Sequence, residues 1–197
     1  MFTFDIKKKE AAMKDTFETP RSPDDHYDAV SRTLHWLMAL VFTWSYCTAA
    51  AHYLASDSAL DKLLWPYHKP AGLLLLVLLI LRAGWNLLQR HNRPPSVNRL
   101  ASFGHGALYA LMFLIPTIGL LRQYGSGREF SAFGLTIMQG FEGEKVQWMI
   151  DLGRDFHSEL GWAMLVLIVG HIGAVILHAL RGDTRVLRRM LGKVRRV

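Results

Sequence analysis

Four long apolar stretches alternate with polar segments along this chain. They cover approximately residues 34–54, 69–88, 103–121 and 156–180. Each has about 20 residues, the length that a helix needs to cross a hydrocarbon core of about 30 Å. Helices of soluble cores rarely stay this apolar over such a length. The pattern therefore predicts an all-α fold, an integral membrane four-helix bundle that crosses the membrane several times.

Positive charge lies outside the apolar stretches and is distributed unequally between the two sides. Lys and Arg number 6 in residues 1–33, 3 in residues 89–102 and 7 in residues 181–197, against 1 in residues 55–67 and 4 in residues 122–155. Cytoplasmic loops carry the excess of Lys and Arg in membrane proteins. We therefore expect both termini in the cytoplasm, and the net charge of +7 reflects topology and no nucleic-acid partner.

The organisation that we expect is a polar cytoplasmic arm (1–26), one transmembrane domain (27–192) and a short basic tail (193–197). The single cysteine, Cys47, lies within a span and cannot form a CxxCH motif, so any heme would be held without thioether bonds. The outer loop, residues 122–155, is a lid or a docking surface, and residues 145–152 within it are expected to form a short amphipathic helix on the membrane surface.

Histidines within the spans are the first sign of chemistry, because an ionisable residue in a membrane usually has a function. His157 and His171 are 14 residues apart, which is about 40° short of four full helical turns. They therefore share one helix face at a separation of roughly 21 Å. That separation is too large for one metal and suits one cofactor near each leaflet.

Two more histidines stand at matching depths. His68 opens the second span on the outer side and can pair with His157, while His35 opens the first span on the inner side and can pair with His171. Each pair of neutral imidazoles could ligate one heme iron. His52 is a rival outer ligand, although it is rotated by about 100° from the His35 face. His105 is placed at the cytoplasmic mouth of span three, which is treated as a packing helix.

Three further residues complete the candidate site. Arg82, 14 residues after His68, is expected near the inner heme, where a propionate would neutralise it; the alternative is snorkelling to cytoplasmic headgroups. His178, two turns beyond His171, is either a competing inner ligand or a quinone-binding residue. The second is favoured, with Thr33 nearby, because His178 could hydrogen-bond a quinone carbonyl and donate a proton.

These residues form a pattern that resembles the bacterial cytochrome b561 family, including its superoxide oxidase branch, over residues 27–192. The matching segments are Ser31-Arg32-Thr33-Leu34-His35-Trp36, residues 68–82, Ala132-Phe133-Gly134-Leu135-Thr136, Phe156-His157-Ser158-Glu159 and Gly170-His171. The resemblance implies two non-covalent hemes b with bis-histidine ligation, ubiquinone or another quinone as a redox partner, and a location in the bacterial inner membrane.

The function that we expect is transmembrane electron transfer, as in respiratory chains, from a periplasmic one-electron donor to quinone. The resemblance favours superoxide as the donor, and the outer cations available to steer an anion are Arg122, Arg128, Lys145 and Arg154. One alternative is a cytochrome b subunit that anchors a periplasmic dehydrogenase or another redox protein. Another is a heme-free transporter with a histidine proton relay. The sequence does not set the oligomeric state.

Overall fold

The computed structural model describes residues 26–91, 94 and 96–192, and the chain there is mostly helical. The element order is α2 (Ala29–Leu54), α3 (Ala59–Leu64), the 3-10 helix η1 (Trp65–Tyr67), α4 (His68–Leu88), α5 (Arg99–Gly125), β1 (Phe130–Ala132), β2 (Leu135–Met138), α6 (Gln147–Leu180) and α7 (Arg185–Leu191). The expected tail, and the expected arm apart from its last residue, His26, lie outside the described residues. The division into arm, domain and tail stays a prediction.

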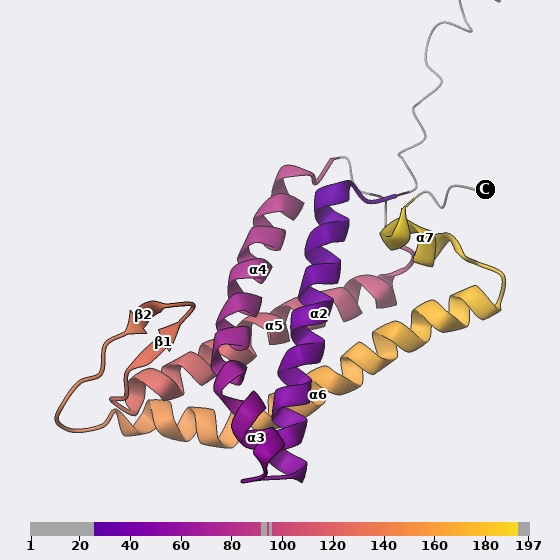
Figure 1. Ribbon diagram of the computed structural model, residues 1–197. Coiled ribbons are helices and arrows are strands. Elements are labelled where there is room, and N and C mark those ends of the chain that lie inside the picture. Colours follow the sequence, from indigo (N-terminus) through magenta and orange to yellow (C-terminus); the bar gives the residue numbers. More distant parts are fainter. Residues whose placement is uncertain (1–25, 92–93, 95, 193–197) are drawn as a thin grey trace, which may run out of the picture.

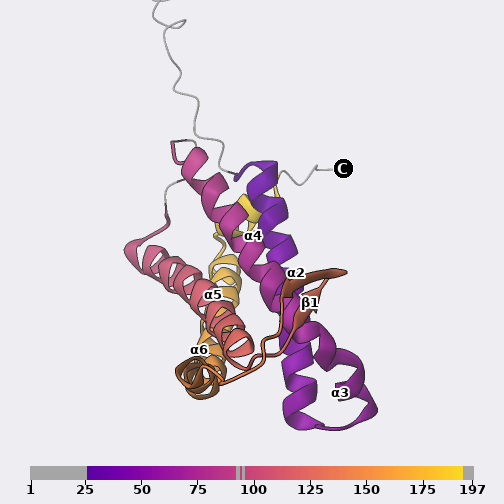
Figure 2. The same ribbon diagram turned by 90° about the vertical axis from the view of Figure 1, so that its left-hand side faces the viewer.

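The long helices form two antiparallel pairs that cross each other (Figure 1). α2 runs beside α4, and α5 runs beside α6. Seen from the side, the α5 and α6 pair lies against one flank of the α2 and α4 pair, and α3 lies at the far end of α2 (Figure 2). Ridges of side chains pack into grooves at such crossings.

Three helical segments of the described chain are long and apolar enough to cross a membrane: Ala59–Leu88, Arg99–Gly125 and Gln147–Leu180. α2 has sufficient length at 26 residues, but polar side chains such as His35, Ser45 and Thr48 lower its hydropathy. The structure thus contains three membrane-capable helices, and the fourth span and the orientation of the bundle stay predictions.

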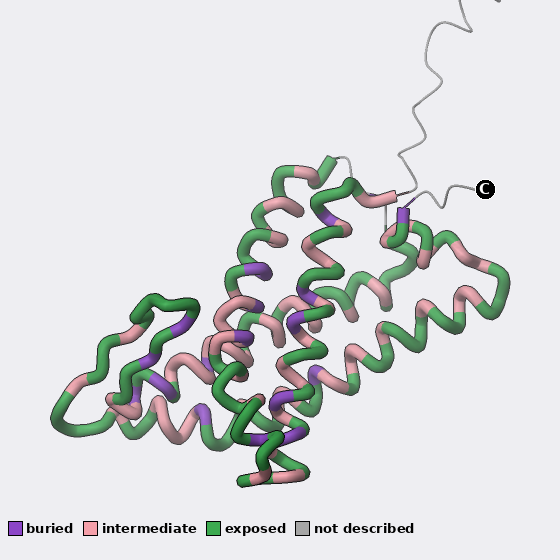
Figure 3. Tube along the Cα trace, in the orientation of Figure 1, coloured by how far each residue is buried: buried purple, intermediate pink, exposed green. Residues whose placement is uncertain are grey.

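The buried core lies between α2 and α4. It consists of Met38 and Val41 from α2 with Ala71, Leu75, Leu78 and Leu79 from α4, and Tyr109 and Met112 of α5 pack against it. In contrast, most of α6 is exposed (Figure 3). Apolar side chains on the outside of a helical bundle are expected where lipid replaces water as the solvent.

The outer loop differs from one prediction. Residues 145–152 do not form a separate surface helix, because α6 begins at Gln147 and continues without a break to Leu180. Gly153 permits this, since the side chain of Arg122 occupies the space where a Cβ at position 153 would lie. The first turns of α6 therefore pack closely against the end of α5.

The AFGLT segment forms the turn of a β-hairpin. β1 and β2 pair in antiparallel register, with Ala132 opposite Leu135. Phe133 and Gly134 between them have φ of 54° and 79°, which is typical of the tight turns that match strand twist. Gln123 anchors the hairpin, because its amide donates to the carbonyls of Arg128 and Glu129 and its oxygen accepts from Lys69 at the start of α4.

Candidate functional site

The outer candidate pair comes from the starts of two helices. His68 is the first residue of α4, and His157 lies in the third turn of α6. Their ring centres are 6.2 Å apart and their planes make an angle of 79°. With metal–nitrogen bonds of about 2.0 Å, two imidazoles on opposite sides of one metal have ring centres about 6 Å apart. The spacing of the outer pair fits one iron between the rings.

Neighbouring oxygen atoms hold the outer imidazoles in a defined tautomer. Thr48, fully buried, donates its hydroxyl proton to the carbonyl of Ser45 (2.7 Å), so its oxygen accepts a hydrogen bond from Nδ1 of His68 (2.9 Å). Nδ1 of His157 donates to the carbonyl of Ile115 (3.0 Å). A proton on Nδ1 leaves Nε2 free as a ligand, which is the usual arrangement around metal-bound histidines.

α5 makes room for the outer pair. Pro116 lies within this helix, and Gly119 one turn later faces His157. A Cβ at position 119 would lie 3.2 Å from Nδ1 and 2.9 Å from Cε1 of that ring, and the second distance is closer than real Cβ contacts. This helix was expected to serve for packing only. Gly119 was the available signal, since a glycine inside a helix often marks a close approach.

The inner candidate pair has the same ring spacing. His35 of α2 and His171 of α6 have ring centres 6.3 Å apart and planes at 71°. This distance again fits two imidazoles with one iron between them. The structure therefore brings together the two pairs that helical periodicity suggests, from three different helices.

Arg82 lies at the inner pair and not among exposed headgroup-level side chains. Its Nη1 is 3.0 Å from Nδ1 of His35 and 4.0 Å from Sδ of Met38, and its guanidinium lies over the ring of Tyr109 at 5.7 Å. Arginine can only donate, so Nδ1 of His35 accepts here. An iron bound at Nε2 requires the proton on Nδ1, and Arg82 would then need another acceptor, such as a heme propionate.

His105, an exposed residue near the start of α5, lies beside the inner pair, because its ring centre is 5.4 Å from that of His171. The reason is that α5 begins at Arg99, capped by Asn98, which places His105 in the second turn of the helix. Its separation from His171 is shorter than the spacing that fits an intervening iron.

The two rival ligands have other partners. Nδ1 of His52 bonds the buried carboxylate of Asp61 (3.0 Å), and its ring stacks on Trp65. His178 lies 3.9 Å from the carboxylate of Asp183, while Thr33 lines a groove of about 510 Å³ between α2 and α7. The structure thus places Thr33 and His178 in different surroundings.

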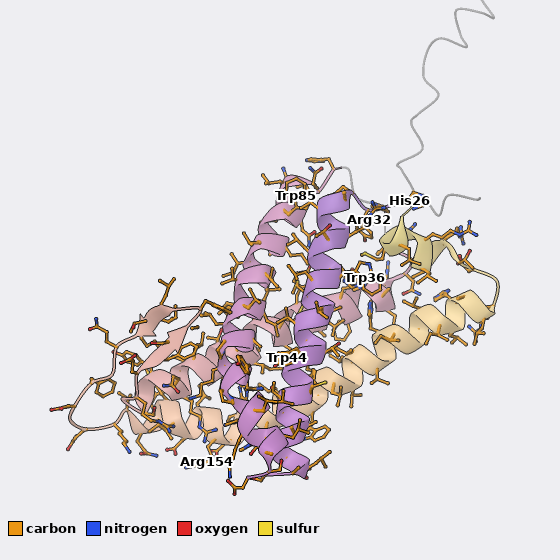
Figure 4. All side chains as sticks on the ribbon, in the orientation of Figure 1. His26, Arg32, Trp36, Trp44, Trp85 and Arg154 are labelled. Atoms are coloured by element: carbon orange, nitrogen blue, oxygen red, sulfur yellow. The ribbon has the colours of Figure 1, made fainter. Side chains whose placement is uncertain are left out.

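The inner end of the bundle is tied together by backbone carbonyls of α7. His26 bonds the carbonyl of Arg188 (3.1 Å), Tyr27 donates its N–H to Arg189 (3.1 Å), and Trp36 donates to Met190 (3.2 Å). Figure 4 shows His26, Arg32 and Trp36 beside α7. The beginning of α2 and the end of the described chain therefore lie at the same end of the bundle.

A pair of imidazoles cannot saturate a metal by itself. Among the residues that the structure describes, no group of three or more His, Cys, Asp or Glu side chains could hold a bare metal ion. A planar macrocycle that supplies its own four nitrogen ligands leaves at most two positions for ligands from the protein. Both histidine pairs fit this requirement.

Apolar membrane-capable helices and paired imidazoles define a membrane protein of the b-type cytochrome class. A profile of the prokaryotic cytochrome b561 family matches residues 26–193, so the chain belongs to this family of heme-binding membrane proteins. It is 28% identical to cytochrome b561 homolog 2 of Escherichia coli (strain K12) and 29% identical to the probable superoxide oxidase CybB of Yersinia pestis. Each match spans 179 residues and covers 86% of this chain, with 93% and 97% of the respective relative.

Proposed function

We propose that this chain holds two hemes b, one at each histidine pair, and moves electrons across the bacterial inner membrane from superoxide outside to quinone inside. The observation that carries the proposal is the spacing of the ring centres, 6.2 Å and 6.3 Å, in two pairs contributed by three helices. α2 is then the fourth span, since it provides His35 and lies beside α4. The excess of Lys and Arg places the end with α7 in the cytoplasm.

His68 with His157, and His35 with His171, would hold the hemes, and each heme would supply a one-electron redox centre. The residues around it hold the imidazoles and exclude water. With a histidine from each of two helices as ligands, the protein would leave a small donor to pass its electron at the edge of the site. Superoxide would lose one electron and leave as O₂, and two such electrons with two protons would reduce one quinone to quinol.

The inner end offers groups suited to a quinone. Thr33 lies in the groove between α2 and α7, whose wall also contains Leu37 and Leu40, an arrangement suited to a polar headgroup with an apolar tail. His178 stands near Asp183, whose pKa is lowered to about 2 by hydrogen bonds from Arg185. An imidazole N–H of His178 could donate a hydrogen bond to a quinone carbonyl.

The cations at the outer end differ in how far acidic neighbours neutralise them. Arg154 forms ion pairs with Asp151 (2.7 Å) and Asp155 (2.8 Å), so little of its charge remains for steering. Figure 4 shows Arg154 near the outer end of the bundle. Arg122, Arg128 and Lys145 are then the cations proposed to attract an anionic donor. The probable superoxide oxidase of Yersinia pestis supports this choice of donor.

A periplasmic partner protein is the second candidate donor, and the hairpin favours it. Phe133 and Leu135 at the hairpin turn are 67% and 66% exposed, and large exposed apolar side chains at a loop tip are typical of docking surfaces. In this case the chain would anchor a periplasmic dehydrogenase or another redox protein. The two candidates differ in whether the purified chain works alone.

The experiment begins with the pyridine hemochrome assay of the purified full-length protein. We expect two hemes b per chain, and a heme-free protein after supplementation would contradict the whole proposal in favour of a transporter. Reconstituted protein is then mixed with superoxide and a soluble ubiquinone. Rapid quinol formation supports the oxidase, whereas two hemes without quinol formation support the anchoring subunit.

A further inference from the structure

A column of three aromatic rings leads from the end of α2 to His68. The rings of His52 and Trp65 have centres 3.7 Å apart and planes at 10°, and the rings of Trp65 and His68 have centres 5.0 Å apart and planes at 17°. The three planes are thus almost parallel. Trp65 therefore stacks on both His52 and His68.

Asp61 fixes the far end of this column. It is only 5% exposed, and its carboxylate contacts Nδ1 of His52 (3.0 Å) and accepts the backbone N–H of Asp57 (3.0 Å). Asp57 has a φ of 63°, a conformation in which its N–H turns toward Asp61. A buried carboxylate with a partner on each oxygen keeps one orientation. His52 is therefore held with its face against Trp65.

The hydrogen bond of His68 does not by itself fix its ring plane. Thr48 holds one atom, Nδ1, and the ring can still tilt about the line that joins this atom to the helix. A large indole face at 17° to the imidazole blocks that tilt. The inner pair lacks an equivalent contact in its two neighbouring rings, because Trp36 and His105 approach His35 and His171 edge-on, at 68° and 67°.

We infer that Asp61, His52 and Trp65 are positioning residues that hold the imidazole plane of His68 nearly perpendicular to that of His157. The inference deepens the proposed function and rests on an iron between these two rings. The angle between two axial imidazole planes determines the anisotropy of the low-spin ferric EPR signal. At 79°, a single large g value is expected, and a smaller angle moves the signal toward an ordinary rhombic form.

The test compares Trp65→Leu with Trp65→Phe in the purified full-length protein. In Trp65→Leu, we expect the outer heme signal to lose anisotropy and its midpoint potential to shift, while the inner signal stays unchanged. Trp65→Phe retains an aromatic face and should restore most of the original signal. An outer signal in Trp65→Leu identical to that of the unmodified protein would overturn the inference, as would equal effects of Leu and Phe.

Two further variants keep the test decisive. If Trp65→Leu loses its outer heme, His52→Leu removes the support of Trp65 without touching His68, and a smaller change in the same direction is expected; an unchanged signal overturns the inference. Trp44→Leu is the matched control, because Trp44 contacts Tyr67 edge-on and not His68. A chain with fewer than two hemes before any substitution would contradict the proposed function, which the hemochrome assay reveals separately.

Discussion

The outer and inner histidine pairs have almost the same ring spacing, but their surroundings differ. At the outer pair, both Nδ1 atoms face oxygen acceptors, the hydroxyl of Thr48 and the carbonyl of Ile115. At the inner pair, Nδ1 of His35 faces the guanidinium of Arg82, a donor. The outer imidazoles thus have hydrogen-bond acceptors that favour a proton on Nδ1 and leave Nε2 available as a ligand, whereas Nδ1 of His35 has a donor as its neighbour.

Two histidine pairs with the same ring spacing can therefore differ in the hydrogen bonds that orient their imidazoles. Preorganised second-layer hydrogen bonds raise metal affinity, and their loss typically weakens it by roughly 10- to 100-fold. The outer pair should therefore be rigid and insensitive to charge. The inner pair should respond to Arg82, whose positive charge must find a new acceptor near the bound cofactor.

The largest effect is expected from replacing a ligand. His68→Leu or His157→Leu should remove only the outer heme, and His35→Leu or His171→Leu only the inner one, because one imidazole cannot hold a bis-histidine heme. The hemochrome assay should fall from two hemes per chain to one in each variant. His52→Leu and His178→Leu serve as controls that retain two. A His171→Leu protein with both hemes would transfer the ligand role to His178.

The next largest effect is expected from Gly119 of α5, which lies beside the outer pair only. In Gly119→Ala, the added methyl group would displace the ring of His157 and its bond to Ile115, so the outer heme should bind roughly 10- to 100-fold more weakly. Heme titration of the apoprotein measures this directly. Gly104→Ala on the same helix is the matched control, because no atom lies within 4 Å of its added Cβ. Equal affinities in the two variants would show that the contact is unimportant.

A smaller effect is expected from the charge beside the inner pair. Arg82→Gln removes a cation that favours the reduced, less positive heme, so the inner midpoint potential should fall by on the order of 50 mV, with the outer potential unchanged. Arg82→Lys retains the charge and should restore most of the potential. Spectroelectrochemical titration resolves the two hemes, and an inner potential unaffected by Arg82→Gln would contradict the assigned position of this charge.

Helical periodicity was sufficient to place His157 and His171 on one face of their helix, because 14 residues bring a side chain back to almost the same direction. The same rule predicted that Arg82 would reach the inner pair. It could not predict the carbonyl of Ile115, since every residue has one, or Trp65, which depends on how η1 folds back beside α2. Those contacts depend on tertiary packing.

Helix boundaries explain one contact that was not predicted and one prediction that was wrong. α5 starts at Arg99, earlier than the apolar stretch suggests, because Asn98 caps it. His105 consequently lies inside the helix, beside His171. α6 likewise begins at Gln147, well before its apolar part, because close packing on α5 stabilises turns that are too polar to be recognised as part of a span.

The smallest expected effect concerns the inner end alone. Asp28 caps α2 by accepting from the N–H and hydroxyl of Ser31 (2.9 Å and 2.6 Å), and it also accepts from the indole of Trp85 at the end of α4 (3.0 Å). Burial raises its pKa, but these hydrogen bonds outweigh that effect and the pKa is lowered from 3.8. A carboxyl with a lowered folded pKa contributes stability that is present above its unfolded pKa and lost as the pH falls through the folded value.

Asp28→Ala should therefore lower the free energy of unfolding at pH 7 by about 1 kcal/mol, the usual cost of losing a helix cap. This difference in unfolding free energy from the unmodified protein should shrink below about pH 4. Asp28→Asn keeps the cap acceptor and should lose less. Unfolding is followed by loss of each heme's absorbance, and the inner heme should leave first because Asp28 joins the helices around His35. If both hemes were lost together at every pH, the two ends of the bundle would unfold as one unit. The outer and inner pairs would then differ only in the residues that contact their histidines.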